Sequence, residues 1–241
     1  MNLKFTVAYD GSSYQGSQKQ PNGMTVEDKL LKAFKKINIE TNIVLSGRTD
    51  KEVHATGQVF NCVVPDFWED FFKLKELLNK NLPNSIKILH IIKVKDEFHS
   101  RFHAKKRVYR YLITSKQTNP FNAKFITYVK NIDEELLKIA IKEFIGVYDF
   151  KYFHKTGSEK DNTKREIFDT KFYKYKDIYV FKFCANSYLR TQIRLMVGFL
   201  IAINDKKLTI EDLKKQLNCE KNIFKTPIAP NGLYLARIFY K

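Results

Sequence analysis

The sequence predicts an α+β protein made of two halves that face each other. In the first hundred residues, segments with strand and helix patterns follow in the order strand, helix, strand, strand, helix, strand. The second half repeats this order with different spacing. With 241 residues, 44% of them hydrophobic, the chain is long enough to bury a substantial core. We expect one half over residues 1–104 and the other over residues 105–241.

The first half begins with a strand at Leu3–Tyr9, where apolar and polar residues alternate. Thr25 and Asp28 have the spacing of a capping box in front of an amphipathic helix. A second helix is predicted over Trp68–Leu82 and is stopped by Pro83. The remaining predicted strands are "NIVLSG", "TGQVFNCVV" and "SIKILHIIKVK".

The second half begins with the strand "RVYRYLIT". A helix follows, with Asp133 at its start and Gly146 at its end. Next come a hairpin, a helix over about Tyr188–Ile203, a short helix at "TIEDLKKQL" and a last strand at "GLYLARIFY". His154–Glu166 is rich in charge and in turn-forming residues, so we expect a mobile loop there.

The charge of the chain favours a polyanionic partner. The formal net charge is +17 and the sequence pI is about 9.6, values that fit binding to nucleic acid through its phosphates. Only eight of the 43 cationic side chains are arginines, whose planar guanidinium can hold a carboxylate or phosphate with two hydrogen bonds. Six of them fall into three short segments: Arg48, Arg101, Arg107, Arg110, Arg190 and Arg194.

Several classes of protein are disfavoured. No apolar run approaches the length of a membrane span, and the N-terminus lacks a signal-peptide pattern, so we expect a cytoplasmic protein without a membrane partner. Cys62, Cys184 and Cys219 are far apart and form no CxxC pair. His99 and His103 are four residues apart but lack the glutamate of an HExxH motif. We therefore expect no metal site.

The strand "KRVYRYLIT" allows two interpretations. Its alternation places Tyr109 and Tyr111 on one face and Arg110 on the other. Buried tyrosines on a strand are commonly core residues with a polar end. Aromatic rings beside arginines also suit the stacking of unpaired bases, at roughly 1–3 kcal/mol per base.

The segment "NSYLRTQIRLMVG" predicts a helix capped by Asn186 or Ser187. Arg190 and Arg194 then fall in its first two turns, where cations oppose the helix dipole. Their position indicates an anion nearby, either a carboxylate or a phosphate. Two solvated arginines are the alternative.

Asp50 lies in "SGRTDKEVHATGQV", between two predicted strands, where an aspartate often bonds its own backbone in a turn. The wider context favours another role. Together with "YDGSSYQG", "FHSRFHAKKRVYRY", "NSYLRTQIRLMVG" and "APNGLYL", this segment resembles the TruA-type tRNA pseudouridine synthase family over nearly the whole chain.

The resemblance implies a pseudouridine synthase fold, in which two similar α+β halves share a mainly antiparallel sheet with a central basic cleft. It implies that Asp50 is the catalytic residue, that Tyr109 lies against the target base, that Arg194 pairs with the catalytic carboxylate and that Arg48 holds the nucleotide. Secondary roles in RNA binding fall to Arg107, Arg110 and Arg190. The implied reaction isomerises uridine to pseudouridine on the 3′ side of the anticodon arm of tRNA, without cofactor or metal, in a homodimer.

Three residues depart from the family pattern. Lys51 and Glu52 replace an Ala-Gly pair after the catalytic aspartate, and Ser17 replaces a tryptophan. We expect these changes to affect the rim of the cleft. A non-catalytic RNA-binding or RNA-chaperone protein on the same scaffold is the main alternative function. A nucleosidase or glycosidase that uses Asp50 is a weaker one, because no second carboxylate at a suitable place completes the usual acid/base pair.

Overall fold

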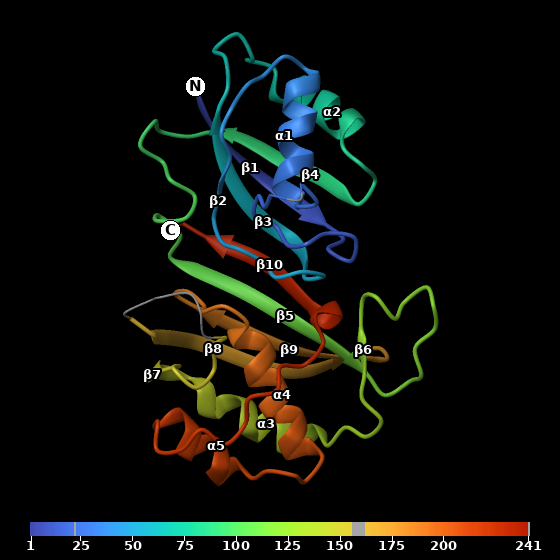
Figure 1. Ribbon diagram of the computed structural model, residues 1–241, viewed down its shortest axis with the longest axis vertical. Coiled ribbons are helices and arrows are strands. Elements are labelled where there is room, and N and C mark those ends of the chain that lie inside the picture. The colour runs from blue at the N-terminus through green and yellow to red at the C-terminus, as the bar shows by residue number, and fades with distance from the viewer. Residues whose placement is uncertain (22, 156–161, 241) are drawn as a thin grey trace. The chain divides into compact units, whose positions relative to one another are not determined.

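The computed structural model describes residues 1–21, 23–155 and 162–240, which form two compact units (Figure 1). Met1–Lys105 and Tyr234–Lys241 belong to the first unit, and Lys106–Leu233 form the second. The chain therefore returns to the first unit at its C-terminal end. In the described part of the chain, no helix is long and apolar enough to cross a membrane.

The sheet of the first unit has the strand order β4–β1–β3–β10, with β2 beside β3. Strand β1 runs antiparallel to both β3 and β4, β2 runs antiparallel to β3, and β10 runs parallel to β3. The strands are β1 (Asn2–Tyr9), β2 (Val44–Leu45), β3 (His54–Val63), β4 (Ile86–Lys93) and β10 (Leu233–Phe239).

Two helices pack on this sheet, α1 (Val26–Lys36) and α2 (Phe71–Asn81) (Figure 1). Thr25 caps α1 in the predicted capping box with Asp28. The core below α1 is aromatic: the rings of Phe5 and Phe60 stack 4.6 Å apart, and the ring of Phe34 meets that of Phe5 edge-on at 5.6 Å. This packing fixes α1 on the strands that carry the loops of the candidate site.

The second unit has the strand order β5–β9–β8–β7, and β6 runs parallel to β5. The other pairs are antiparallel. Its strands are β5 (Lys106–Thr114), β6 (Thr127–Tyr128), β7 (Gly146–Asp149), β8 (Lys164–Tyr175) and β9 (Ile178–Ala185). Its helices are α3 (Glu134–Ala140), the 3-10 turn η1 (Ile141–Phe144), α4 (Gln192–Asn204), α5 (Ile210–Leu217) and the 3-10 turn η2 (Pro230–Gly232).

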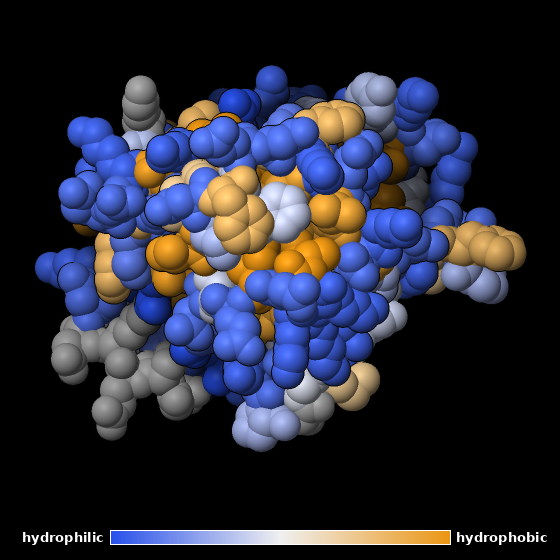
Figure 2. Space-filling model, turned by 90° about the horizontal axis from the view of Figure 1, so that it is seen from above, coloured by the Kyte–Doolittle hydropathy of each residue, from blue (hydrophilic) through white to orange (hydrophobic). Residues whose placement is uncertain are grey.

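The predicted α+β class with mainly antiparallel strand pairing is confirmed. Most of the predicted elements are present in the predicted order. The surface seen from above in Figure 2 is mostly hydrophilic, as expected for a chain with a net charge of +17.

The predicted start of α4 is wrong. The helix begins at Gln192, and neither Asn186 nor Ser187 caps it. Thr191 has a φ of +65°, a left-handed conformation that separates the preceding residues from the helix. The Asn186 side chain instead accepts hydrogen bonds from the amides of Glu166 and Ser187, at 3.3 and 2.6 Å.

The prediction of a mobile loop over residues 154–166 is wrong at the C-terminal end of this segment. Residues 156–161 lie outside the described part of the chain. Residues 164–166 begin β8 and pair with β7, because Arg165 and Glu166 stand opposite Tyr148 and Val147.

Candidate active site

Asp50 lies in the loop between β2 and β3 of the first unit, and it is half-buried. The segment Tyr14–Ser17 holds the backbone of this loop on both sides of Asp50. Before it, the Thr49 amide donates to Ser17 Oγ at 2.8 Å, and the Ser17 amide donates to the Thr49 carbonyl at 3.2 Å. After it, the Glu52 amide donates to the Tyr14 carbonyl at 3.3 Å.

A buried polar network lies below the same loop. The hydroxyls of Tyr9 and Thr49 are 2.9 Å apart. Gln58 accepts a hydrogen bond from the Ser46 hydroxyl at 2.6 Å and donates to the Gly47 carbonyl at 2.9 Å. Burial raises the pKa of the Tyr9 hydroxyl to about 12, and its hydrogen bond with Thr49 opposes this rise, so the phenol is neutral at physiological pH. The loop that carries Asp50 thus rests on hydrogen-bonded polar groups.

Gly16 brings the two backbones together. A Cβ at this position would lie 2.8 Å from the Thr49 carbonyl oxygen, and the residue has a φ of +104°. A side chain here would push the Tyr14–Ser17 segment away from the Asp50 loop.

Glu52 lies in the left-handed region, with a φ of +65°. This region favours glycine, because the Cβ of other residues crowds the backbone. The backbone after Asp50 therefore keeps a conformation that suits glycine while it carries a glutamate. The side chain of Glu52 meets that of Lys51 at 3.7 Å in an exposed ion pair.

His54, at the start of β3, has a structural role. It is 1% exposed, its ring stacks on Tyr234 at 4.7 Å, and its Nδ1 accepts the Gly11 amide at 3.0 Å. Because Nδ1 accepts this hydrogen bond, it has no proton to donate to Asp10, whose carboxylate is 3.3 Å away.

Tyr109 lies on β5 of the second unit and is 8% exposed. Its ring meets that of Tyr188 edge-on, with centroids 5.2 Å apart. The Tyr188 hydroxyl is buried and has no hydrogen-bond partner among the residues that the structure describes. The ring of Tyr109 thus packs in the second unit, as expected for a core tyrosine. Its role as a stacking surface for a base stays a prediction.

Arg194 is half-buried in the first turn of α4, and residue 228 holds it twice. Its Nε donates to the Ile228 carbonyl at 2.8 Å, and its own carbonyl accepts the Ile228 amide at 3.1 Å. Gly198 permits this contact, since a Cβ there would lie 2.5 Å from the Thr226 carbonyl oxygen. The guanidinium group therefore has a fixed direction at the N-terminal end of a helix, where anions are favoured.

Arg190 is exposed and lies before α4, so the expectation that it belongs to the first two turns of this helix is wrong. Arg107 braces the same approach to the helix, because its Nη1 donates to the Asn186 carbonyl at 2.6 Å. Arg48 is exposed in the loop before Asp50.

Arg110 points away from Tyr109 on the opposite face of β5 and is exposed. The strand register places Arg110 opposite Lys182, and Lys182 opposite Lys171. Three cations thus form a row across three strands, and the carboxylate of Asp169 lies 2.9 Å from Lys182. Like charges in register repel each other, so this row suits a polyanion.

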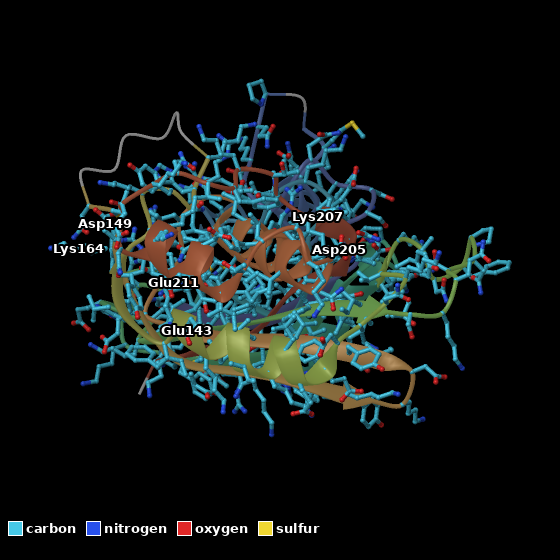
Figure 3. The ribbon with its side chains drawn as sticks, turned by 90° about the horizontal axis from the view of Figure 1, so that it is seen from below. Glu143, Asp149, Lys164, Asp205, Lys207 and Glu211 are labelled. Atoms are coloured by element: carbon cyan, nitrogen blue, oxygen red, sulfur yellow. The ribbon has the colours of Figure 1, made fainter. Side chains whose placement is uncertain are left out.

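The second unit also has a hollow of about 860 Å³ between Tyr128–Asp133 and the end of α4. Two of its lysines are paired: Lys206 meets Asp133 and Lys207 meets Asp205, each at 3.0 Å. Figure 3 shows Asp205 and Lys207 side by side. The hollow therefore offers less positive charge to a phosphate than its lysines alone would indicate.

The structure places Asp50 and Arg48 in the first unit, and Tyr109, Arg194 and Arg107 in the second. The pairing of Asp50 with Arg194 thus involves both units and stays a prediction. Within residues 1–21, 23–155 and 162–240, no group of three His, Cys, Asp or Glu side chains could hold a metal ion.

The comparison with known proteins agrees with the motifs. A family model described as tRNA pseudouridine synthase matches residues 6–103 and 140–241. The chain belongs to this family.

Curated relatives match it from end to end. The "tRNA pseudouridine synthase A" of Campylobacter jejuni (strain RM1221) is 37% identical over 242 residues and is covered completely, as is this chain. The protein of the same name from Helicobacter hepaticus is 38% identical over 244 residues, covering 99% of this chain and 98% of that one. The one from Helicobacter pylori is 36% identical over 245 residues, covering 99% of both.

The structure shows where one departure from the pattern of the tRNA pseudouridine synthase family lies. Ser17, expected at the rim of a cleft, is fully buried and bonds the backbone next to Asp50, so that expectation is wrong. Sequence reasoning missed Ser17, Thr49 and Tyr9 as neighbours of the Asp50 loop. The signal was present in part, because a small polar residue replaces a large aromatic one at position 17.

Proposed function

We propose that this protein converts uridine to pseudouridine in tRNA, on the 3′ side of the anticodon arm, with Asp50 as the catalytic carboxylate. The full-length match to curated tRNA pseudouridine synthases carries this proposal. The proposed enzyme is a cytoplasmic homodimer that needs no cofactor or metal.

Asp50 suits the chemistry. Isomerisation breaks the bond from C1′ to N1 of uracil and forms a bond from C1′ to C5, so nothing is oxidised and no group is imported. A carboxylate can attack C1′ or remove a proton from the sugar, and either route leaves the base free to turn. Both routes need Asp50 ionised and held in position. The hydrogen bonds that fix the backbone at Thr49 and Glu52 support the second requirement.

Arg194 supports the first requirement. We propose that the two units form a basic cleft in which Arg194 pairs with Asp50 and favours its charged form. The position of Arg194 in the first turn of α4 supports this pairing, because a cation there is unfavourable unless an anion is close. The bonds to Ile228 hold the side chain ready for such an anion.

Tyr109 and Arg48 are the proposed contacts to the target nucleotide. The base must leave the helical stack before its glycosidic bond can be reached. A tyrosine ring provides a surface for the base, and Arg48 holds the nucleotide outside the stack. Arg107, Arg110 and Arg190 are proposed to contact RNA in secondary roles, through phosphates and without reading sequence.

The test is to incubate the protein with an unmodified tRNA transcript and to map pseudouridine by carbodiimide-dependent stops of reverse transcription. We expect wild type to produce pseudouridine in the anticodon arm and Asp50→Asn to produce none. Asp177→Asn, in the turn between β8 and β9, is the matched control and should leave the yield unchanged. If wild type binds tRNA without forming pseudouridine, the non-catalytic RNA-binding alternative is correct. Release of free uracil would identify a nucleosidase.

Two substitutions test the proposed role of Arg194. Arg194→Ala should fold and bind tRNA but turn over far more slowly, because Asp50 loses its charge partner. Arg194→Lys keeps a positive charge but loses the planar guanidinium and the Nε donor to Ile228, so it should recover only part of the activity. Near-normal turnover of Arg194→Ala would remove this residue from the site.

A further inference from the structure

We propose that Ser17 and Tyr9 are positioning residues for Asp50: through Thr49 they hold the loop where its carboxylate can reach the substrate. This inference rests on the proposed function, because it concerns the same carboxylate. It assigns a purpose to a buried polar network that the reaction itself does not require.

Ser17 forms two hydrogen bonds with the backbone of Thr49, one as acceptor and one as donor. Its hydroxyl accepts the Thr49 amide at 2.8 Å, and its amide donates to the Thr49 carbonyl at 3.2 Å. Ser17 is fully buried and Thr49 is 7% exposed, so water cannot readily replace either bond. The residue next to Asp50 is therefore held at both of its backbone polar groups.

Ser17 is itself fixed by a helix. The carbonyls of Gly16 and Ser17 accept the amides of Val26 and Glu27 at 3.2 and 3.0 Å, at the start of α1. The capping box of Thr25 fixes the same turn, and the aromatic core holds the helix on the sheet. The short segment Gly16–Ser17 is thus bonded to the start of α1 on one side and to the Asp50 loop on the other.

Tyr9 holds the side chain of Thr49. It is the last residue of β1, and its hydroxyl lies 2.9 Å from Thr49 Oγ1. Because β1 pairs with strands on both sides, this hydroxyl has a fixed position. Thr49 is thus held from a strand by its side chain and from a helix-bound loop by its backbone.

Asp50 needs such support because it lies outside regular secondary structure. A displacement of about 1 Å of a catalytic group can reduce turnover about 100-fold without changing the chemistry. Loss of the Ser17 hydroxyl would leave the Thr49 amide buried and unpaired, and the loop would move to find it a partner. A structural role alone would lower stability, whereas a positioning role lowers turnover while tRNA still binds.

The experiment compares Ser17→Ala and Tyr9→Phe with wild type. Ser100→Ala is the matched control, since Ser100 is also a fully buried serine of the first unit, and its hydroxyl donates to the Val44 carbonyl. For each variant we would measure turnover at saturating tRNA, the Kd for tRNA, the melting temperature, and hydrogen exchange in peptides covering residues 46–53.

We expect Ser17→Ala to lower turnover by roughly 10- to 100-fold, with the Kd for tRNA within about twofold of wild type. Exchange in residues 46–53 should become faster. Tyr9→Phe should act in the same direction but more weakly, because the two backbone bonds of Thr49 remain. Ser100→Ala should lower the melting temperature and leave turnover unchanged. If Ser17→Ala fails to fold, Tyr9→Phe carries the test alone.

Wild-type turnover in Ser17→Ala or, if that variant does not fold, in Tyr9→Phe would overturn the proposal, even if the melting temperature fell. An equal loss of turnover in Ser100→Ala would also overturn it, because the effect would then follow stability. Failure of the proposed function is a separate outcome: wild type itself would make no pseudouridine. In that case unchanged exchange in residues 46–53 of Ser17→Ala would refute the positioning of the loop.

Discussion

Replacing Glu52 by glycine should stabilise the protein, although it removes a side chain. Glu52 has a φ of +65°, and a left-handed conformation costs a residue with a Cβ roughly 1–2 kcal/mol. Glycine avoids this cost but loses about 0.5–1 kcal/mol more conformational entropy on folding. The exposed ion pair with Lys51, at 3.7 Å, contributes little. The expected gain in the free energy of unfolding is about 0.5–1 kcal/mol.

Urea denaturation monitored by circular dichroism measures this gain, and the melting temperature should rise by about 1–4 °C. Lys51→Gly is the matched control, because Lys51 is the exposed neighbour and does not have a positive φ. It should destabilise the protein by about 0.5–1 kcal/mol. Glu52→Ala keeps the Cβ and removes the carboxylate, so it should change stability little. If Glu52→Gly is as destabilising as Lys51→Gly, the backbone strain at Glu52 is not real and the reasoning fails.

Tyr188→Phe should raise the free energy of unfolding by about 1 kcal/mol in urea titrations, because it removes a buried hydroxyl that lacks a partner among the described residues; a loss of stability would show that the hydroxyl is satisfied. Arg110→Ala and Lys182→Ala should each reduce the slope of log affinity for tRNA against log salt by about one, with turnover at saturation unchanged; an unchanged slope would exclude the row from RNA binding. Burial raises the pKa of Tyr9 and of Cys62 to about 12 from 10.0 and 9.0, so the unfolded state releases these protons first. The free energy of unfolding should therefore be full below about pH 9 and should fall towards pH 12, by up to about 1.4 kcal/mol per pH unit for each group, whereas equal stability at pH 8 and pH 11 would contradict this.

The sequence predicted the elements whose signals are local. Thr25 and Asp28 form the expected capping box of α1, and Thr209 and Asp212 form one at α5. The start of α4 could not be found in this way. Asn186 is a good capping residue by type, but its side chain bonds the amide of Glu166, twenty residues away in the sequence. The side chain is therefore occupied by a tertiary contact and cannot cap the helix. The capping propensity of asparagine does not indicate whether such a distant partner exists.

The candidate site shows the same division. Asp50 could be proposed from its motif, because the resemblance to the family implies a carboxylate there. Its support could not, since Tyr9, Ser17 and Thr49 meet only after β1, α1 and the loop before β3 have come together. The left-handed backbone at Glu52 was likewise outside sequence reasoning, which noted a missing glycine but could not give its φ.

Under the proposed function, Asp50 must be held in position and must be charged, and different units meet these two requirements. Its position is set within the first unit, where hydrogen bonds from Ser17 and Tyr9 fix the residue before it. Its proposed charge partner is Arg194, which belongs to the second unit and is fixed there by Ile228. The two are therefore separable by experiment. A variant at Ser17 should slow turnover and also speed hydrogen exchange in residues 46–53, because the Thr49 amide loses its partner. A variant at Arg194 should slow turnover and leave that exchange unchanged, because it removes no backbone hydrogen bond of the Asp50 loop.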